Sequence, residues 1–141
     1  MRKKASKSLP ALRSACPISY ALDFVGDKWT LIVLRDLIFS RKQYFQQFLE
    51  SNEGIASNIL AARLKLLERT GLATRKEDPE HGRRVVYAPT DKALDLMPVM
   101  LELLRWGSKY NAKSAAPAHI VKGASEDREA LIAEFRSLHG R

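Results

Sequence analysis

Apolar residues recur along the first part of the chain at the spacing of amphipathic helices. From Pro17 to Gly26 they stand three or four positions apart, and proline is favoured in the first turn of a helix. The segment 28–39 follows Asp27, a residue typical of helix N-caps, and its apolar residues surround it on more than one side. The pattern predicts a short amphipathic helix and then a buried central one.

Two more helices are predicted around a polar turn. In segment 40–50, aromatic and apolar residues lie on one face of a short third helix. The sequence SNEG, which ends at Gly54, is typical of a turn. A fourth helix is expected from about Ala56 to Arg69, because Gly71 is a favoured residue just beyond a helix C-terminus.

Beyond the fourth helix the pattern changes to two β-prone segments. Residues 72–76 and 85–89 flank EDPEHGRR, which is rich in turn-forming residues, and together they predict a hairpin. This order of elements predicts a winged helix-turn-helix, a mainly α fold with a small β-hairpin wing. In such a fold the helix at about 56–69 enters the major groove of DNA. The wing at about 77–85 then reaches a neighbouring phosphate or the minor groove.

The next stretch predicts a long apolar helix that begins at Thr90 and is kinked at Pro98. It is apolar nearly all round, so both of its sides need a cover. Its own domain supplies one cover, and a two-fold related second copy supplies the other. Six of its residues are expected at this dimer interface: Leu94, Met97, Met100, Leu101, Leu104 and Trp106. The alternative is that a helix in the tail covers this surface in cis, using Leu131, Ile132, Phe135 and Leu138.

The fourth helix has two different faces. Leu60, Leu64 and Leu67 fall within a narrow arc that must face the core. The other side carries small and polar residues that allow a close approach to base edges: Ser57, Asn58, Ala61, Ala62, Lys65 and Arg69. Asn58 is suited to adenine, and Lys65 to guanine or a phosphate. The alternative is an ordinary amphipathic helix with a solvated polar face, but the turn before it and the hairpin after it favour DNA binding.

Further cations lie near this helix. Arg63 is at the margin of the apolar arc, where an ion pair with a neighbouring helix and a phosphate contact both stay open. At the wing, His81, Arg83 and Arg84 cluster at the turn. Adjacent strand residues point to opposite faces, so at least one of the two arginines is expected to meet phosphate. The alternative is a charged turn that keeps the protein soluble. Arg41 and Lys42, before the third helix, are additional candidates for contacts with the DNA backbone.

The net charge of +8 comes from 24 Lys and Arg against 16 Asp and Glu. Five of these cations and no acid lie within residues 1–13, so the other residues carry 19 cations against 16 acids, or +3. Composition alone therefore does not establish nucleic-acid binding. We expect a flexible basic arm over 1–14, a DNA-binding domain over 15–110 with a dimerisation helix at about 90–107, and a linker with a short helix over 111–141.

The sequence gives little support for a disulfide, a metal site, a membrane span or an enzyme active site. Cys16 is the single cysteine, and the three histidines are far apart in sequence, so no internal disulfide, metal site or cofactor is expected. No apolar run approaches the roughly 20 residues of a membrane span, and the N-terminus lacks the apolar core of a signal peptide. A cytoplasmic protein without a membrane partner is expected. A Cys-His pair, a Gly-rich phosphate loop and a carboxylate pair are all missing, so we expect no enzyme.

Four blocks of the sequence, in order, resemble the HxlR-type winged helix-turn-helix regulators: the CP pair at 16–17, GDKWTLIVLRDL, GIASNILAARLKLLERTGL and VVYAPTDKALDLMPVMLELLRWG. The resemblance covers about residues 15–110. It implies a homodimeric transcription factor, more often a repressor than an activator. The chain departs from the family pattern at Gln43 or Tyr44, where a basic residue is usual, at Gln47, where an acid is usual, and at Ala93, where glycine is usual.

The resemblance also draws attention to Cys16, since some members of this family look like thiol sensors with a cysteine before proline. A helix N-terminus and a nearby cation such as Arg13 stabilise a thiolate. As the single cysteine, Cys16 is limited to an intermolecular disulfide, a mixed disulfide or an adduct with an electrophile. The alternative is that Cys16 is a small, inert residue buried beside the dimer helix.

The function expected is that of a sequence-specific regulator that binds double-stranded DNA as a homodimer. Its two recognition helices would occupy half-sites of a pseudo-palindromic operator about 34–36 Å apart. An oxidant or a small molecule held near the last helix is the expected kind of effector. The alternative is a winged-helix module that binds protein or RNA without a specific operator.

Overall fold

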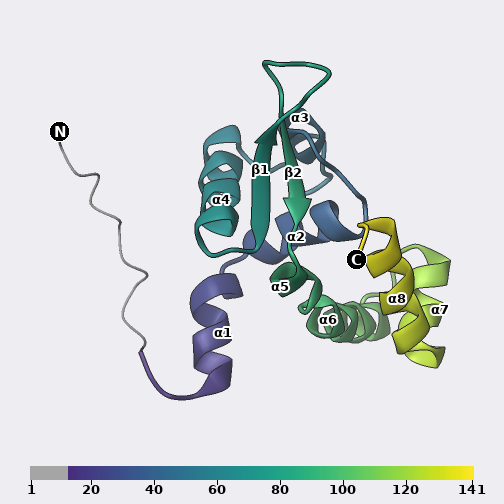
Figure 1. Cartoon of the computed structure of the whole chain (residues 1–141). Helices are drawn as coiled ribbons and strands as arrows, with labels where there is room; N and C mark the ends of the chain where they lie inside the picture. Colours follow the sequence, from purple (N-terminus) through teal and green to yellow (C-terminus); the bar gives the residue numbers. More distant parts are fainter. Residues whose placement is uncertain (1–12) are drawn as a thin grey trace.

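The structure is a computed structural model that describes residues 13–141 and is mainly helical with one hairpin (Figure 1). Most of the expected basic arm, residues 1–12, lies outside the described residues. The elements, in chain order, are α1 (Pro17–Val25), α2 (Thr30–Ile38), α3 (Phe45–Leu49), α4 (Ser57–Arg69), β1 (Ala73–Glu77), β2 (Val85–Pro89), α5 (Asp91–Leu94), α6 (Met97–Tyr110), α7 (Ala118–Glu126) and α8 (Arg128–Leu138). This order confirms the predicted winged helix-turn-helix.

Helix α2 lies at the centre of the fold, as its apolar surroundings predicted. It contacts α1, α4 and β2, and Leu34 and Ile38 are completely buried. Its start is capped by Asp27, whose Oδ2 accepts the backbone N–H groups of Trp29 at 2.9 Å and Thr30 at 3.0 Å. These bonds satisfy two of the amides that a helix N-terminus leaves without a partner.

Helix α4 is fixed to this core by its predicted leucine arc. Leu60, Leu64 and Leu67 are at most 1% exposed. The helix ends as predicted at Gly71, whose φ of 74° is accessible to glycine at little cost. The N–H of Gly71 donates to the carbonyl of Glu68 and that of Leu72 to the carbonyl of Leu67, the pattern of a Schellman motif.

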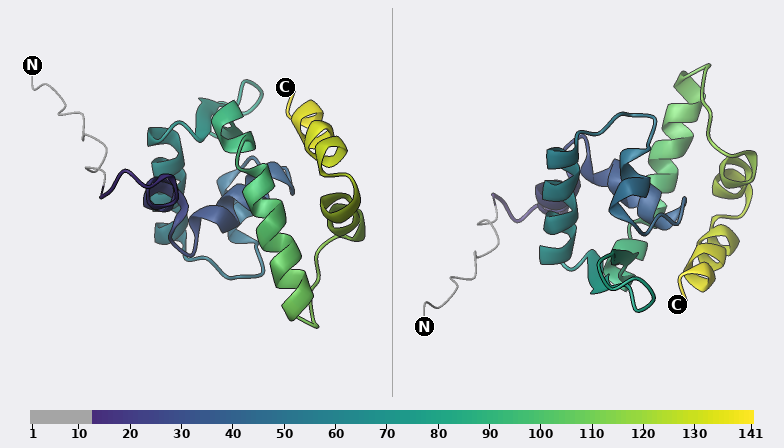
Figure 2. Two further views of the ribbon diagram at one scale, coloured as in Figure 1. Left: turned by 90° about the horizontal axis from the view of Figure 1, so that it is seen from below. Right: turned by 90° about the horizontal axis from the view of Figure 1, so that it is seen from above.

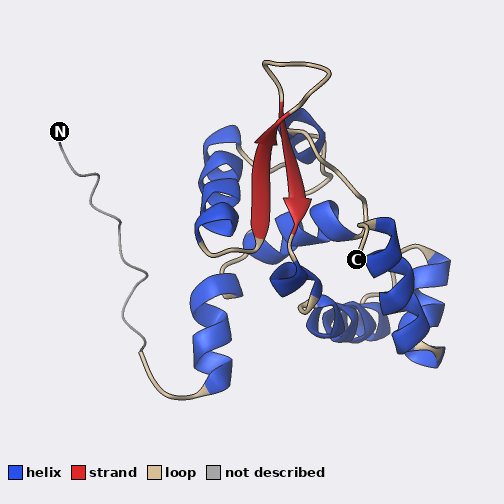
Figure 3. Cartoon of the chain, in the orientation of Figure 1, coloured by secondary structure: helices blue, strands red, loops and turns tan. Residues whose placement is uncertain are grey.

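The hairpin is a two-stranded antiparallel sheet, with register from Ala73 opposite Pro89 to Glu77 opposite Val85. Figure 3 shows the two strands standing beside α4, with the loop that joins them projecting beyond the helices. The N–H of Tyr87 donates to the carbonyl of Gln43 at 2.9 Å, which ties β2 to the segment before α3. The strands of the wing are therefore held both by their pairing with each other and by a hydrogen bond to the helical body.

The predicted long helix after the wing is two helices instead. Thr90 caps the short α5 as expected, through an N–H of Ala93 at 3.3 Å, but the chain leaves the helix after Leu94 and resumes it at Met97. Pro98 lies in the first turn of α6. Proline has no N–H to donate. Residues in the interior of a helix need this donor, but residues in the first turn do not, so Pro98 is compatible with the start of α6 and does not kink it.

The tail forms two helices, α7 and α8, where a linker and one short helix were expected. They lie alongside α6 in both views of Figure 2. Leu131 and Phe135 are buried, and the Phe135 ring meets that of Phe39 edge to face, with 4.9 Å between centroids. Nε2 of His139 donates to the carbonyl of Ile38 at 2.8 Å. Helices α7 and α8 therefore cover one side of α6 in cis, which is the alternative that the sequence left open.

None of the helices within residues 13–141 combines the length and the apolar character needed to span a bilayer.

Candidate nucleic-acid interface

The outer face of α4 is open. The residues predicted to read DNA there are all exposed: Ser57, Asn58, Ala61, Ala62, Lys65 and Arg69. The N-cap position is held by Ala56, which has no side-chain acceptor for the first amides of the helix. Those amides are therefore available to a phosphate, which a helix N-terminus attracts. The geometry allows a duplex to reach this face, and the individual contacts stay predictions.

Arg63 belongs to the body of the protein. Its Nη1 lies 3.3 Å from Oδ1 of Asp27, the residue that caps α2. Partial burial acts to raise the pKa of Asp27, but hydrogen bonds from Thr30 and Trp29 and the charge of Arg63 together hold it below its usual value. Of the two interpretations of Arg63, the ion pair between helices is the one that the geometry supports.

The turn of the wing, residues 78–84, is organised around a buried carboxylate. Asp78 is 6% exposed and accepts the backbone N–H of Glu80 at 3.0 Å and the hydroxyl of Tyr44 at 2.9 Å. Nδ1 of His81 lies 3.3 Å from the same carboxylate. The bond from Glu80 is the main cause that holds the pKa of Asp78 below its usual value, and accepting from Tyr44 raises the pKa of that phenol.

The two wing arginines lie in the turn before β2 rather than in a strand, and they have different surroundings. Arg84 places its guanidinium 3.8 Å from the centroid of the Tyr44 ring, a cation–π contact. Arg83 is exposed and makes no ion pair within residues 13–141. Arg83 is therefore the more available of the two for a phosphate. His81 is exposed but already faces Asp78.

The cations before α3 are engaged with the protein itself. Nζ of Lys42 lies 3.0 Å from Oδ2 of Asp36 and donates to Oγ of Ser51 at 2.7 Å. Its side chain is only 22% exposed, so this ammonium stabilises the buried Asp36 rather than lying ready for a phosphate. Arg41 is exposed, with its Nη2 3.5 Å from the carbonyl of Leu138 at the end of α8.

Three residues have roles that the sequence patterns did not indicate. Gln47 accepts the backbone N–H groups of Gln43 at 2.8 Å and Tyr44 at 3.0 Å, so it caps α3 where the family usually has an acid. Tyr44 was expected as part of an apolar face and as a departure from the basic position of the family, but not as a partner of the wing. Arg75 of β1 and Lys65 of α4 line one shallow hollow of about 330 Å³ between the recognition helix and the wing. A cation at an alternating strand position was the available signal for Arg75.

The predicted dimer residues divide into two groups. Leu94, Met97, Met100 and Leu101 are buried in the chain's own core, which corrects the expectation that they face a second copy. They were misplaced because the break between α5 and α6 turns this side toward the domain. Leu104 is half-buried, and Trp106 is 68% exposed. Trp106 belongs to a stripe along α6, spaced four, three and four residues apart: Val99, Leu103, Trp106 and Tyr110.

The first helix also presents apolar side chains. Ile18 is 71% exposed and Leu22 is 51% exposed, so these two apolar side chains are not covered by the core of the chain. Cys16, the N-cap residue of α1, is exposed as well, so the structure does not bury it within its own chain. The nearby Arg13 donates from Nε to Oδ1 of Asp23 at 2.6 Å. Within residues 13–141 no cluster of His, Cys, Asp and Glu could hold a metal ion.

Known proteins are similar to this chain both in sequence and in fold. The sequence model of the HxlR-like helix-turn-helix family matches residues 24–115. The HTH-type transcriptional regulator BH0655 of Halalkalibacterium halodurans is 36% identical over 93 residues, which cover 66% of this chain and 82% of that protein. PA1607, described as a candidate transcription factor, superimposes with a TM-score of 0.66 at 33% identity over 74% of this chain and 73% of its own.

A third similar protein is the redox regulator HypR in its oxidised form. It has a TM-score of 0.62 and 27% identity, and the match covers 68% of this chain and 98% of HypR. The family model, which matches residues 24–115, spans α2 to α6 and so includes α4 and the hairpin. The chain therefore belongs to the HxlR-like helix-turn-helix family, and it is a transcriptional regulator with a DNA-binding fold rather than an enzyme.

Proposed function

We propose that this regulator binds a pseudo-palindromic operator as a homodimer and represses transcription by blocking access of the polymerase. The observation that carries the proposal is the outer face of α4, where exposed small and polar residues adjoin a helix N-terminus without a side-chain cap. Asn58 and Lys65 read base edges, while the first amides of α4 hold a phosphate. Arg83, at the tip of the wing, adds a second phosphate contact.

The second copy packs against the surface that the tail leaves uncovered. Helices α7 and α8 cover one side of α6, yet Val99, Leu103, Trp106 and Tyr110 form an exposed stripe on it. A contiguous apolar stripe in water is typical of an interface, and two-fold symmetry is the commonest arrangement for a homo-oligomer. Ile18 and Leu22 of α1 supply further apolar surface for the partner. In such a dimer two recognition helices face half-sites about one DNA turn apart.

Cys16 gives the dimer a thiol that an oxidant can reach. It is exposed at the start of α1, beside the apolar residues assigned to the partner contact. HypR, to which this chain is similar, is described as a redox regulator. In the proposed reaction the Cys16 thiols of two copies each lose one electron and one proton and join as a disulfide. The oxidant diamide takes up both electrons and both protons and becomes the hydrazine. Cys16→Ser should bind DNA normally and lose the response to diamide; an unchanged response would rule out the sensor.

Selection of bound fragments from the host genome tests the operator proposal. The expected result is enrichment of one inverted repeat whose half-site centres lie about 10–10.5 base pairs apart. Lys65→Ala should lose the enrichment, whereas Arg105→Ala, which changes an exposed cation of α6 that pairs with Glu102, should retain it. If wild-type protein enriches no sequence and its affinity for DNA is insensitive to salt, the protein-interaction or RNA-binding alternative takes the place of this proposal.

A further inference from the structure

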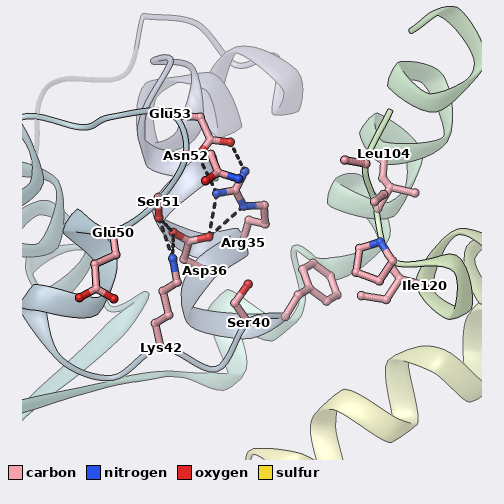
Figure 4. A pocket seen from close by; sticks show the side chains of 14 residues that line it. Arg35, Asp36, Ser40, Lys42, Glu50, Ser51, Asn52, Glu53, Leu104 and Ile120 are labelled. Atoms are coloured by element: carbon pink, nitrogen blue, oxygen red, sulfur yellow. Dashed lines mark hydrogen bonds and ion pairs between the residues drawn. The ribbon is translucent and has the colours of Figure 1, made fainter. Parts of the chain in front are cut away.

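A cavity separates the helix-turn-helix body from the tail. It has a volume of about 530 Å³, within the range of pockets for drug-sized ligands (Figure 4). One end is polar and includes Arg35, Asp36 and Glu53, and the other end is apolar and includes Leu104 and Ile120. The cavity therefore offers a ligand both a charged wall and an apolar wall.

A second hollow of about 520 Å³ extends the apolar end. It shares Arg35, Phe39, Leu104 and Ala116 with the first, and its other walls are mostly apolar. These additional apolar residues come from α2 and α6: Leu31, Ile32, Met100 and Leu103. Phe39 is thus an aromatic residue common to the linings of both hollows.

The roof of the cavity is built by the tail. Ala116, Pro117 and Ile120 line it, and all three lie beyond residue 115, where the match to the family ends. The tail is held in place by Phe135 against Phe39 and by Arg136, whose Nη2 donates to Oδ1 of Asp95 at 2.5 Å. The roof of the cavity therefore lies outside the region that matches the family model.

The charges of the polar end favour a cationic ligand. Arg35 donates to Glu53 at 2.5 and 3.0 Å and to Asp36 at 2.8 and 2.9 Å, and Lys42 pairs with the same Asp36. Both cations of the wall are thus already neutralised by carboxylates. Glu50 lines the cavity and has no ion pair within the described chain, which leaves one negative charge in excess. An anion would have to displace Glu53 or Asp36, whereas a cation is attracted by the excess negative charge that Glu50 gives the polar wall, and Phe39 adds an aromatic side chain to the lining.

We infer that this cavity binds a lipophilic organic cation, and that the bound cation weakens DNA binding. Glu53 stands in the turn that precedes α4, and its pair with Arg35 joins that turn to α2 along the cavity wall. An occupant that moves Arg35 therefore changes the position of the turn and of the recognition helix after it. The effect on DNA rests on the proposed operator function, but binding of the cation does not.

Binding is tested by calorimetry on the full chain without DNA. The probe is tetraphenylphosphonium, and tetraphenylborate is a control of nearly the same shape and opposite charge. We expect the phosphonium to bind at least about tenfold more tightly than the borate. Equal or tighter binding of the borate would overturn the charge argument.

Two variants locate the site. Ala116→Trp fills the space shared by both hollows and should abolish binding of the phosphonium. Glu50→Gln should weaken it about three- to tenfold, and Glu129→Gln, which neutralises an exposed carboxylate on α8, should leave it unchanged. Unaltered affinity in Ala116→Trp, with folding verified by circular dichroism, would place the ligand elsewhere and reject the cavity.

The effect on DNA is measured separately, with the selected operator. Saturating phosphonium should lower operator affinity at least about fivefold in wild type and not in Ala116→Trp. An operator affinity that ignores the bound cation overturns the coupling through Arg35 and Glu53. If no operator is found, the proposed function fails while the calorimetric result still decides the cavity.

Discussion

The hydroxyl of Tyr44 donates a hydrogen bond of 2.9 Å to Oδ2 of Asp78, which joins the start of α3 to the turn of the wing. The guanidinium of Arg84 lies over the ring of the same tyrosine, 3.8 Å from the ring centroid. The Tyr44 side chain therefore holds the wing in two ways, by the hydrogen bond from its hydroxyl and by the contact of its ring with Arg84. A wing that is fixed before it meets DNA loses less conformational entropy on binding, so this relationship favours affinity without contacting a base.

The two functions of Tyr44 can be separated. Tyr44→Phe removes the hydroxyl and keeps the ring under Arg84, so we expect a loss of about two- to fivefold in affinity for any duplex. Tyr44→Leu removes both contacts and should lose more. Hydrogen exchange of the Glu80 amide, which donates to Asp78, reports the loosened turn directly. A Tyr44→Phe variant with faster exchange but full affinity would show that the order of the wing does not limit binding.

Stability in acid should depend on Glu53. Hydrogen bonds from Arg35 lower its pKa from 4.5 to about 2. A carboxylate with a lowered folded pKa stabilises the protein fully above its unfolded pKa, and this stabilisation is lost as pH falls from 4.5 toward 2. Both side chains are about one-third exposed, so water screens the pair and we expect a contribution of only about 1 kcal/mol.

Urea unfolding at pH 7 and pH 3 measures this contribution. Wild type should lose more stability between the two pH values than Glu53→Gln does, by about the 1 kcal/mol expected for a partly screened pair. Glu134→Gln, a change at an exposed carboxylate of α8, should behave as wild type. Equal losses in wild type and Glu53→Gln would mean that the pair adds nothing to stability.

The parts of the fold that were predicted correctly are those with a local cause. The leucine repeat of α4 and Gly71 after it define that helix within their own neighbourhood, and both were confirmed. The break between α5 and α6 follows from Pro98, which the sequence showed, but whether proline kinks or restarts a helix depends on where the chain turns back.

The sequence patterns could not predict which side chains become partners once the chain has folded. Lys42 and Arg63 looked like candidates for phosphate because a cation near a recognition helix has the same local pattern whether it faces DNA or an acid. Asp27, the partner of Arg63, becomes its neighbour through the packing of α2 and α4. Asp36, the partner of Lys42, is only six positions away and is reached because the chain turns back just after α2. The bond from Tyr44 to Asp78 spans 34 positions and leaves no periodic signal.

If Arg63 is a structural residue, its removal should affect folding and not DNA. Arg63→Met should lower the free energy of unfolding by about 0.5–1 kcal/mol, since the pair with Asp27 is partly exposed. The dependence of DNA affinity on salt should stay that of wild type. Lys65→Met is the matched change on the outer face of α4, where we expect unchanged stability and a salt slope smaller by about 1. A reduced slope in Arg63→Met would restore Arg63 to the interface.

Recognition and positioning should separate between α4 and the wing. Asn58→Ala should reduce discrimination at one base pair by about 1–3 kcal/mol and hardly change binding to other sequences. Arg83→Ala should weaken all sequences alike and lower the salt slope by about 1. Binding to a panel of single-base operator variants measures both effects. Wild-type behaviour of both variants would mean that DNA meets a different surface.

The dimer should depend on the stripe of α6. Leu103 is 52% exposed at its centre, so Leu103→Asp places a charge where a second copy is proposed to pack while leaving the core of the chain intact. We expect this variant to sediment as a monomer of 15.9 kDa at concentrations where wild type is dimeric. Leu138→Asp, at a 43% exposed leucine of α8, is the matched control and should stay dimeric. Because a monomer occupies one half-site at a time, Leu103→Asp should also lose the preference for two correctly spaced half-sites over one. A Leu103→Asp protein that remains dimeric would move the interface to α1, and Ile18→Asp would then be the variant that dissociates it.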